Sequence, residues 1–352
     1  MLHAMAPDRG AHGRDGVAGR PTLRDVARLA GVSTKTASRV LNGERGVAAS
    51  TAQAVERAMR QLDYRPNFTA SSLRRAGGRT KAIAAILEDV GNPFSAAVLR
   101  ALEDTAREQG VLIIAGSIDE DPAREQELVR AFVARRADAL VIAPASHSQA
   151  YLNAELASGT PIVVVDRAPV GIATDAVLVD NHGGARRAVE HLLAGGHRRI
   201  GYLGDLQTIA TARLRYRGYA DALHRAGVDV DPRLVVHDLH NESTAHDAAL
   251  GLLAAPLAPT ALFTAQNNVT VGAVRGIHQR GIQHRVALVG FDDIPLADVL
   301  SPGISVIAQD PSAIGRLAAE VAFRRLAGDR SPPETVVVPT ELRVRGSGEL
   351  PA

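Results

Sequence analysis

Short apolar runs alternate with helical segments over most of the chain from Lys81 onward, and this alternation restricts the fold more than any other feature. Strands that are apolar on both faces are typical of parallel sheets covered by helices on both sides. We therefore expect an α/β protein with doubly wound sheets, in which each run is a strand followed by a helix. The eight runs read AIAAIL, VLIIAG, ALVIAP, PIVVVD, AVLVD, RIGYLG, ALFTA and VALVGFD.

The runs fall into two sets, at about residues 81–179 and 180–307, and this division predicts two lobes. Three remaining segments would close the lobes and cross between them. They are ISVIAQD, a helix over 311–327, and VVVPTELRVR. We assign about 81–179 and 309–338 to an N-lobe, and about 180–308 and 339–352 to a C-lobe. Two such lobes form a cleft at the carboxyl ends of their strands, where small ligands bind.

Residues 22–43 read TLRDVARLAGVSTKTASRVLNG and predict a helix-turn-helix unit. Thr22 and Asp25 have the spacing of a capping box, Gly31 permits a sharp turn, and Ser33 can cap the second helix. The outward positions of that helix carry polar side chains that can bond base edges or phosphates. A third helix from about residue 50 to 62 would complete a small core.

Charge is distributed unevenly along the chain. Residues 20–81 contain 13 Lys and Arg against 4 Asp and Glu, whereas residues 82–352 contain 25 against 32. A basic surface confined to the first domain is expected of a protein that contacts DNA phosphates.

The helix-turn-helix stretch and the segment YRPNFTASSL at residues 64–73 resemble those of the lactose-repressor and purine-repressor (LacI-GalR) family of bacterial transcription regulators. The resemblance covers nearly the whole chain from Thr22. It implies a disordered arm (1–20), a DNA-binding head (21–64), a hinge helix and linker (65–80), and an effector-binding and dimerisation domain (81–352) of periplasmic-binding-protein type.

By position, the resemblance also implies which residues contact DNA. The second helix would lie in the major groove, and Leu73 of the hinge helix would wedge into a central base step and bend the duplex. The expected DNA-binding residues are Thr22, Ser33, Thr34, Lys35, Thr36, Ser38, Arg39, Asn42, Asn67, Ala70, Ser71 and Leu73.

Polar residues near strand ends are the physical candidates for the cleft lining, and the family's ligand positions can be carried onto this sequence. The expected effector-binding residues are Asn92, Phe94, Asp166, Thr211, Arg215, Gln266, Asp292 and Gln309. Asp166 and Asp292 could instead cap turns. The chain departs from the family at Gln266 and Asn267, where most relatives have Asn-Asp. Phe94, Tyr216 and Phe291 could stack on a sugar ring, although core packing is the more natural role for Phe291.

Several classes of function lack support in the sequence. There is no cysteine, and we find no phosphate-binding loop, dinucleotide motif, zinc-protease motif or serine-hydrolase elbow, so we expect no catalytic residues, cofactor or metal. His237 and His240 have a spacing that could serve a metal, but a solvated loop is the simpler interpretation. Without an export signal or an apolar span, we expect a cytoplasmic protein that does not enter a membrane.

These observations predict a sequence-specific transcriptional regulator, and the family resemblance implies most simply a repressor that a sugar releases from DNA. We expect a homodimer on near-palindromic double-stranded operator DNA, since no C-terminal heptad is present to build a tetramer. The alternatives are a regulator with a nucleobase or another metabolite as corepressor, a solute-binding protein, and an enzyme.

Overall fold

The computed structural model describes residues 21–41, 44, 46–64 and 79–352. The chain divides into two compact units, Met1–Gly78 and Arg79–Ala352. Some of the expectations concern residues outside this description. They are those for the N-terminal arm, for the hinge helix, and for Asn42, Asn67, Ala70, Ser71 and Leu73.

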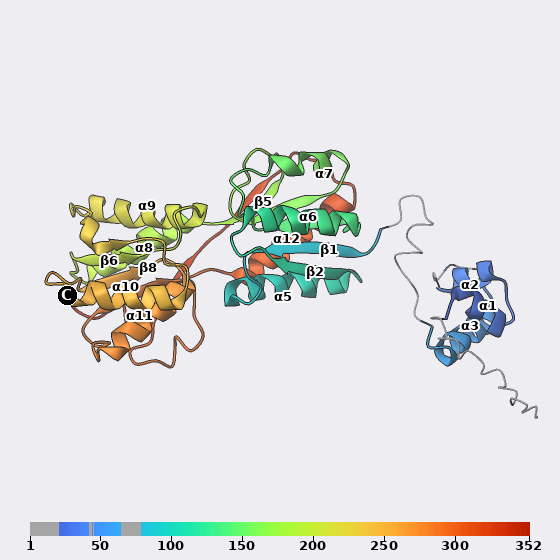
Figure 1. Cartoon of the computed structure of the whole chain (residues 1–352), viewed down its shortest axis with the longest axis horizontal. Helices are drawn as coiled ribbons and strands as arrows, with labels where there is room; N and C mark the ends of the chain where they lie inside the picture. The colour runs from blue at the N-terminus through green and yellow to red at the C-terminus, as the bar shows by residue number, and fades with distance from the viewer. Residues whose placement is uncertain (1–20, 42–43, 45, 65–78) are drawn as a thin grey trace, which may run out of the picture. The chain divides into compact units, whose positions relative to one another are not determined.

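Three helices form the described part of the first unit: α1 (Leu23–Leu29), α2 (Thr34–Leu41) and α3 (Ala49–Gln61) (Figure 1). The capping box is confirmed, because the Asp25 backbone N–H donates to the Thr22 hydroxyl at 3.4 Å and the Thr22 N–H donates to the Asp25 carboxylate at 2.9 Å. The small core that joins the three helices comprises Val26, Ala27, Ala37, Val55 and Ala58.

The turn between α1 and α2 has the predicted form. Gly31 has a φ of +68°, a left-handed conformation that glycine adopts without strain. The Thr36 backbone N–H donates to the Ser33 hydroxyl at 3.1 Å, so Ser33 caps α2 as expected.

In the second unit, the first lobe contains a six-stranded parallel sheet in the order β11-β5-β4-β3-β1-β2. Side chains alternate across it: Ile83, Ala85 and Leu87 pack with α5 and α12, and Ala84 and Ile86 pack with α6. The lobe comprises β1 (Ala82–Leu87), α5 (Pro93–Glu108), β2 (Leu112–Ser117), α6 (Pro122–Ala134), β3 (Ala139–Ile142), η1 (Ala150–Leu152), α7 (Asn153–Ala157), β4 (Ile162–Asp166), β5 (Asp175–Val179), α12 (Pro311–Leu326) and β11 (Thr335–Val338).

The second lobe contains a sheet in the order β12-β10-β9-β8-β6-β7, parallel except for β12, which runs antiparallel to β10. Helices α8 and α9 cover one face, and α10 and α11 cover the other. The lobe comprises α8 (Asn181–Ala194), β6 (Ile200–Leu203), α9 (Ala210–Arg225), η2 (Pro232–Leu234), β7 (Val235–Val236), α10 (Glu242–Ala254), β8 (Ala261–Thr264), α11 (Asn267–Gln279), β9 (Ala287–Phe291), β10 (Ser305–Ala308) and β12 (Glu341–Arg343).

The doubly wound fold is confirmed, and all eight apolar runs contain strands. The expectation that a helix follows every run is wrong for PIVVVD, because β4 leads to its neighbour β5 through residues 167–174 without a helix. Helix α12 arrives from the far end of the sequence and packs on β3, β4 and β5. This part of the sheet is therefore covered without a local helix.

The chain crosses between the lobes three times, from β5 to α8, from β10 to α12, and from β11 to β12 (Figure 1). Each crossing is short. Asp180 lies in the crossing from β5 to α8, and its backbone N–H donates at 3.3 Å to the carbonyl of Val338, the last residue before the crossing from β11 to β12. Each lobe has its own pair of cores, so these crossings are the covalent links about which the lobes can move.

Candidate functional site

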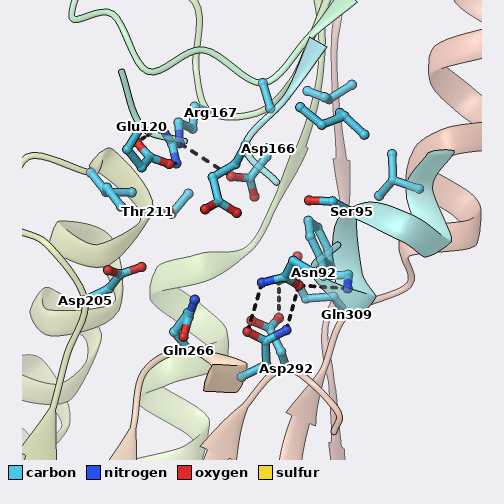
Figure 2. Close-up of a pocket in the computed structure, with 18 of the residues that line it drawn as sticks. Asn92, Ser95, Glu120, Asp166, Arg167, Asp205, Thr211, Gln266, Asp292 and Gln309 are labelled. Carbon is cyan, nitrogen blue, oxygen red and sulfur yellow. Dashed lines mark hydrogen bonds and ion pairs between the residues drawn. The ribbon is translucent and has the colours of Figure 1, made fainter. Parts of the chain in front are cut away.

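A cleft with an empty volume of about 680 Å³, counted to its open mouth, lies between the two lobes (Figure 2). All eight expected effector-binding residues line it, and they come from both lobes. The lining also includes Glu88, Ser95, Glu120, Arg167, Asp205, His240 and Asn267, and apolar residues such as Val98, Val165 and Ile314.

Arg215 projects from α9 into the cleft and is held on several sides. Its Nε donates to Asn181 Oδ1 at 2.7 Å, and its Nη1 donates to the Ala265 carbonyl at 2.8 Å. The guanidinium carbon lies 3.9 Å from the centre of the Phe291 ring, which is itself fully buried. Phe291 therefore serves as a platform for Arg215, and its orientation is set before any ligand arrives.

Asp292 follows β9 and turns its carboxylate into the cleft. Its φ of +72° is in the left-handed region, where aspartate is tolerated better than most residues. Gln309 Nε2 donates to one carboxylate oxygen, and Arg215 Nη1 lies 3.5 Å from the other. Burial raises the pKa of Asp292, against the lowering influence of Arg215.

Asp166 follows β4 in the same manner, with a φ of +65°. Its carboxylate lies 3.7 Å from the Nε of Arg167. The two Nη atoms of Arg167 donate to the Glu120 carboxylate, and Nη1 also donates to the Pro144 carbonyl at 2.8 Å (Figure 2). Glu120 and Arg167 thus form a buried, forked ion pair at the edge of the site.

Asn92 connects the lobes directly. Its Oδ1 accepts from the Phe94 backbone N–H at 3.0 Å, which caps α5, and from Asn267 Nδ2 of the second lobe at 2.8 Å. The family departure at Gln266 has a local explanation, because Gln266 Oε1 accepts from the Val269 backbone N–H at 3.1 Å and caps α11.

A second polar connection between the lobes involves His240. Its Nδ1 lies 2.8 Å from Asp205, and its Nε2 lies 3.6 Å from Glu88 of the first lobe. The bond to Asp205 raises the pKa of His240, while burial, followed by the charge of Glu120, raises the pKa of Glu88 to about 7. His240 lies in a loop and is partly exposed, as expected, and its side chain also lines the cleft.

Several cleft residues were not among those expected from the sequence. Glu88, Arg167 and Asp205 lie at or just after the ends of strands, so the strand-end rule that selected Asp166 could have selected them as well. Glu120 and His240 lie in loops before helices, where sequence alone gives no comparable signal.

The expected DNA-contacting side chains of α2 lie on its outer side. Thr34 and Lys35 are exposed, Thr36, Ser38 and Arg39 are partly exposed, and Ala37 faces the core. Arg39 Nε lies 3.3 Å from Glu44, in an exposed ion pair that contributes little to stability. Thr22 and Ser33 serve as caps and are also exposed.

Metal-binding clusters and membrane-spanning helices are both absent from the described residues. No group of three or more His, Cys, Asp or Glu side chains there could hold a metal ion. In the same part of the chain, every helix is too short or too polar to cross a bilayer.

Comparisons with known proteins agree with this architecture. Residues 22–67 match the family model "Bacterial regulatory proteins, lacI family", and residues 189–348 match "Periplasmic binding protein-like domain". The HTH-type transcriptional regulator PtxS of Pseudomonas plecoglossicida is 34% identical over 333 residues, which cover 93% of this chain and 96% of PtxS. The chain belongs to the LacI family. It is therefore a transcriptional regulator with a DNA-binding domain, and not an enzyme.

Other members are similarly close. GalR of Escherichia coli is 32% identical over 92% of this chain and 94% of its own. Among solved structures, the lac repressor dimer bound to operator and the anti-inducer ONPF has a TM-score of 0.82 and 25% identity, over 93% of this chain and 99% of that one. The complex of the regulator CelR with cellobiose has a TM-score of 0.66 and 30% identity, over 93% and 100% of the respective chains.

Proposed function

We propose that this LacI-family protein is a repressor whose binding to operator DNA is controlled by a sugar in the cleft between the lobes. The observation that carries the proposal is that polar side chains from both lobes line one cleft. A ligand there contacts both lobes and favours one angle between them, so its binding energy is coupled to the lobe arrangement.

The DNA-binding part of the proposal rests on the basic first unit and on α2. Two protomers would place two copies of α2 in successive major grooves of a near-palindromic operator, with Leu73 of each hinge at the centre. The similar lac repressor binds its operator as a dimer, which supports the same arrangement here.

The sugar is supported by the chemistry of the lining. Carboxylates, amides and guanidinium groups can accept from and donate to hydroxyls. Phe94 is the aromatic residue among the described lining residues and can cover one apolar ring face. The CelR complex holds cellobiose, a sugar.

The proposal can be tested by selecting bound fragments from random DNA with the purified full-length protein, without addition and with a panel of sugars and nucleobases. We expect enrichment of an inverted repeat that one sugar abolishes. Enrichment that appears only with a nucleobase would favour a corepressor instead, and failure to prefer any inverted repeat over scrambled duplex would refute the proposal.

A further inference from the structure

Negatively charged groups outnumber positively charged ones in the cleft. Five carboxyl groups line it, against two guanidinium groups and one imidazole. The carboxyl groups belong to Glu88, Glu120, Asp166, Asp205 and Asp292, and the basic groups belong to Arg167, Arg215 and His240. Whether the cleft accepts an anion depends on whether a guanidinium fork is available to it.

The fork of Arg167 is already occupied. Both of its Nη atoms donate to Glu120, and the two side chains are only 9% and 10% exposed. Its Nε is buried without a hydrogen-bond partner, 3.7 Å from the Asp166 carboxylate. The Nε–H and one Nη2–H of Arg167 remain without a hydrogen bond, but the Asp166 carboxylate already lies beside this edge, so an added carboxylate or phosphate would meet a negative charge there.

Arg215 is committed through two of its three nitrogens, whereas its Nη2 bonds no other described residue and can donate to a ligand hydroxyl. Its Nε and Nη1 bond Asn181 and the Ala265 carbonyl, Asp292 lies 3.5 Å away, and one face of the group rests on Phe291. The pairing with Asp292 compensates its charge. A pair of neighbouring hydroxyls, in contrast, can accept from the guanidinium and donate to the carboxylate.

The remaining groups are mainly acceptors. Gln309 donates to Asp292, and its own Oε1 is buried without a partner in a residue that is 8% exposed. Asp166 and Asp205 add carboxylate oxygens, with His240 paired to Asp205. Burial, followed by the charge of Glu120, raises the pKa of Glu88, so this part of the cleft disfavours a further negative charge.

We propose that the cleft selects a polyhydroxylated effector that carries no acid group, and that it discriminates against sugar acids and sugar phosphates. The inference rests on the proposed function and narrows its ligand class. Each hydroxyl both donates and accepts, so a neutral ligand can bond to the guanidinium donors and to the carboxylate acceptors of the cleft. A carboxylate or phosphate can only accept, and would lie among carboxylates.

The test is titration calorimetry of the full-length protein at pH 8 with matched series of compounds. The series are D-glucose, D-glucuronate and D-glucose 6-phosphate; D-galactose, D-galacturonate and D-galactose 6-phosphate; and D-ribose, D-riburonate and D-ribose 5-phosphate. We expect the neutral sugar to bind at least tenfold more tightly than its acid or phosphate in each series that binds.

Tighter binding of an acid or a phosphate would overturn this inference and leave the proposed sugar effector intact. Binding of none of the nine compounds, with a purine base bound instead, would refute the sugar effector and this inference together.

A variant with an altered charge balance provides the second test. Glu120→Gln removes the carboxylate that pairs with both Nη atoms of Arg167 and leaves only Asp166 beside it, so the ratio of acid to neutral-sugar affinity should rise at least tenfold. If Glu120→Gln does not fold, Asp166→Asn replaces it in the test. This variant removes the other carboxylate beside Arg167 and should shift the ratio of acid to neutral-sugar affinity in the same direction. The control Glu103→Gln makes the same change as Glu120→Gln at an exposed position of α5 and should leave the ratio unchanged. An unchanged ratio in both cleft variants would contradict the proposal.

Discussion

Arg215 shows how one side chain acquires a set orientation from several weak contacts. Lysine at this position would keep the charge near Asp292, but it lacks the planar fork that bonds Asn181 and Ala265 and stacks on Phe291. We expect Arg215→Lys to lower the free energy of unfolding by about 1–3 kcal/mol. Urea unfolding followed by tyrosine fluorescence measures this loss. Arg217→Lys, an exposed position in the same helix, is the matched control, and equal stability of the two variants would contradict the role given to Arg215.

Lys35 is the exposed lysine of α2, and its role on DNA can be separated into two kinds of contact. If its ammonium contacts a phosphate, Lys35→Ala should weaken binding to all sequences alike and reduce the salt slope by about one unit. If it contacts a base, affinity should fall by about 1–3 kcal/mol for the selected operator and less for other sequences. Binding titrations at several salt concentrations distinguish these results. Arg57→Ala, on the exposed side of α3, is the control, and no loss in Lys35→Ala would exclude the residue from the interface.

At the scale of elements, the helices that carry cleft residues depend on close backbone contacts. A Cβ added at Gly218 of α9 would lie 2.4 Å from the His182 carbonyl oxygen of α8, a separation that requires the helices to move apart. We expect Gly218→Ala to destabilise the protein by about 1–3 kcal/mol and to displace Arg215, which lies on the same helix. Gly251 in α10 has no atom within 4 Å of an added Cβ, so Gly251→Ala should stabilise it by about 0.5–1 kcal/mol. Scanning calorimetry compares the two, and a stabilised Gly218→Ala protein would disprove the close contact.

The sequence predicted the helices and strands better than it predicted the contacts between them. Apolar runs and capping patterns specified the strands and the starts of α1 and α2, because these depend on neighbours within a few residues. Other contacts join segments that are far apart in the chain, and sequence patterns did not predict them. They are the packing of α12 on β4 and β5, the contact of Asn92 with Asn267, and the pairing of Glu120 with Arg167. Strand-end logic could indicate that Asp166 and Asp292 face a cleft, but not which carboxylate neutralises which arginine.

At the scale of the whole second unit, the burial of Glu88 beside Glu120 and the bond of His240 to Asp205 make stability depend on pH. The pKa values of both groups are raised in the folded protein, to about 7 for Glu88. A raised pKa stabilises the fold below the unfolded value, and this stability is lost as the pH rises through the folded value. The groups that face Glu88 are Glu120, His240, Asp89 and Arg167.

Unfolding free energies should therefore decline between pH 5 and pH 8, with a contribution from Glu88 on the order of 1–3 kcal/mol. Urea titrations at pH 5, 6, 7 and 8 measure the decline. Glu88→Gln should reduce it, whereas the exposed-site variant Glu103→Gln should retain it. An identical pH profile in Glu88→Gln and the parent protein would show that Glu88 does not titrate in this range.

The three short crossings between the lobes have a mechanical consequence. Asp310 and Pro339 line a single groove, so two of the crossings lie close together, and Asp180 bonds the backbone of Val338 next to Pro339. Connecting segments placed side by side in this way allow the lobes to open and close about one axis. They resist twisting of one lobe against the other. Compounds of graded size would then hold the lobes at graded angles along one coordinate, so ligands with partial effects on DNA binding should arise between fully active and inert analogues.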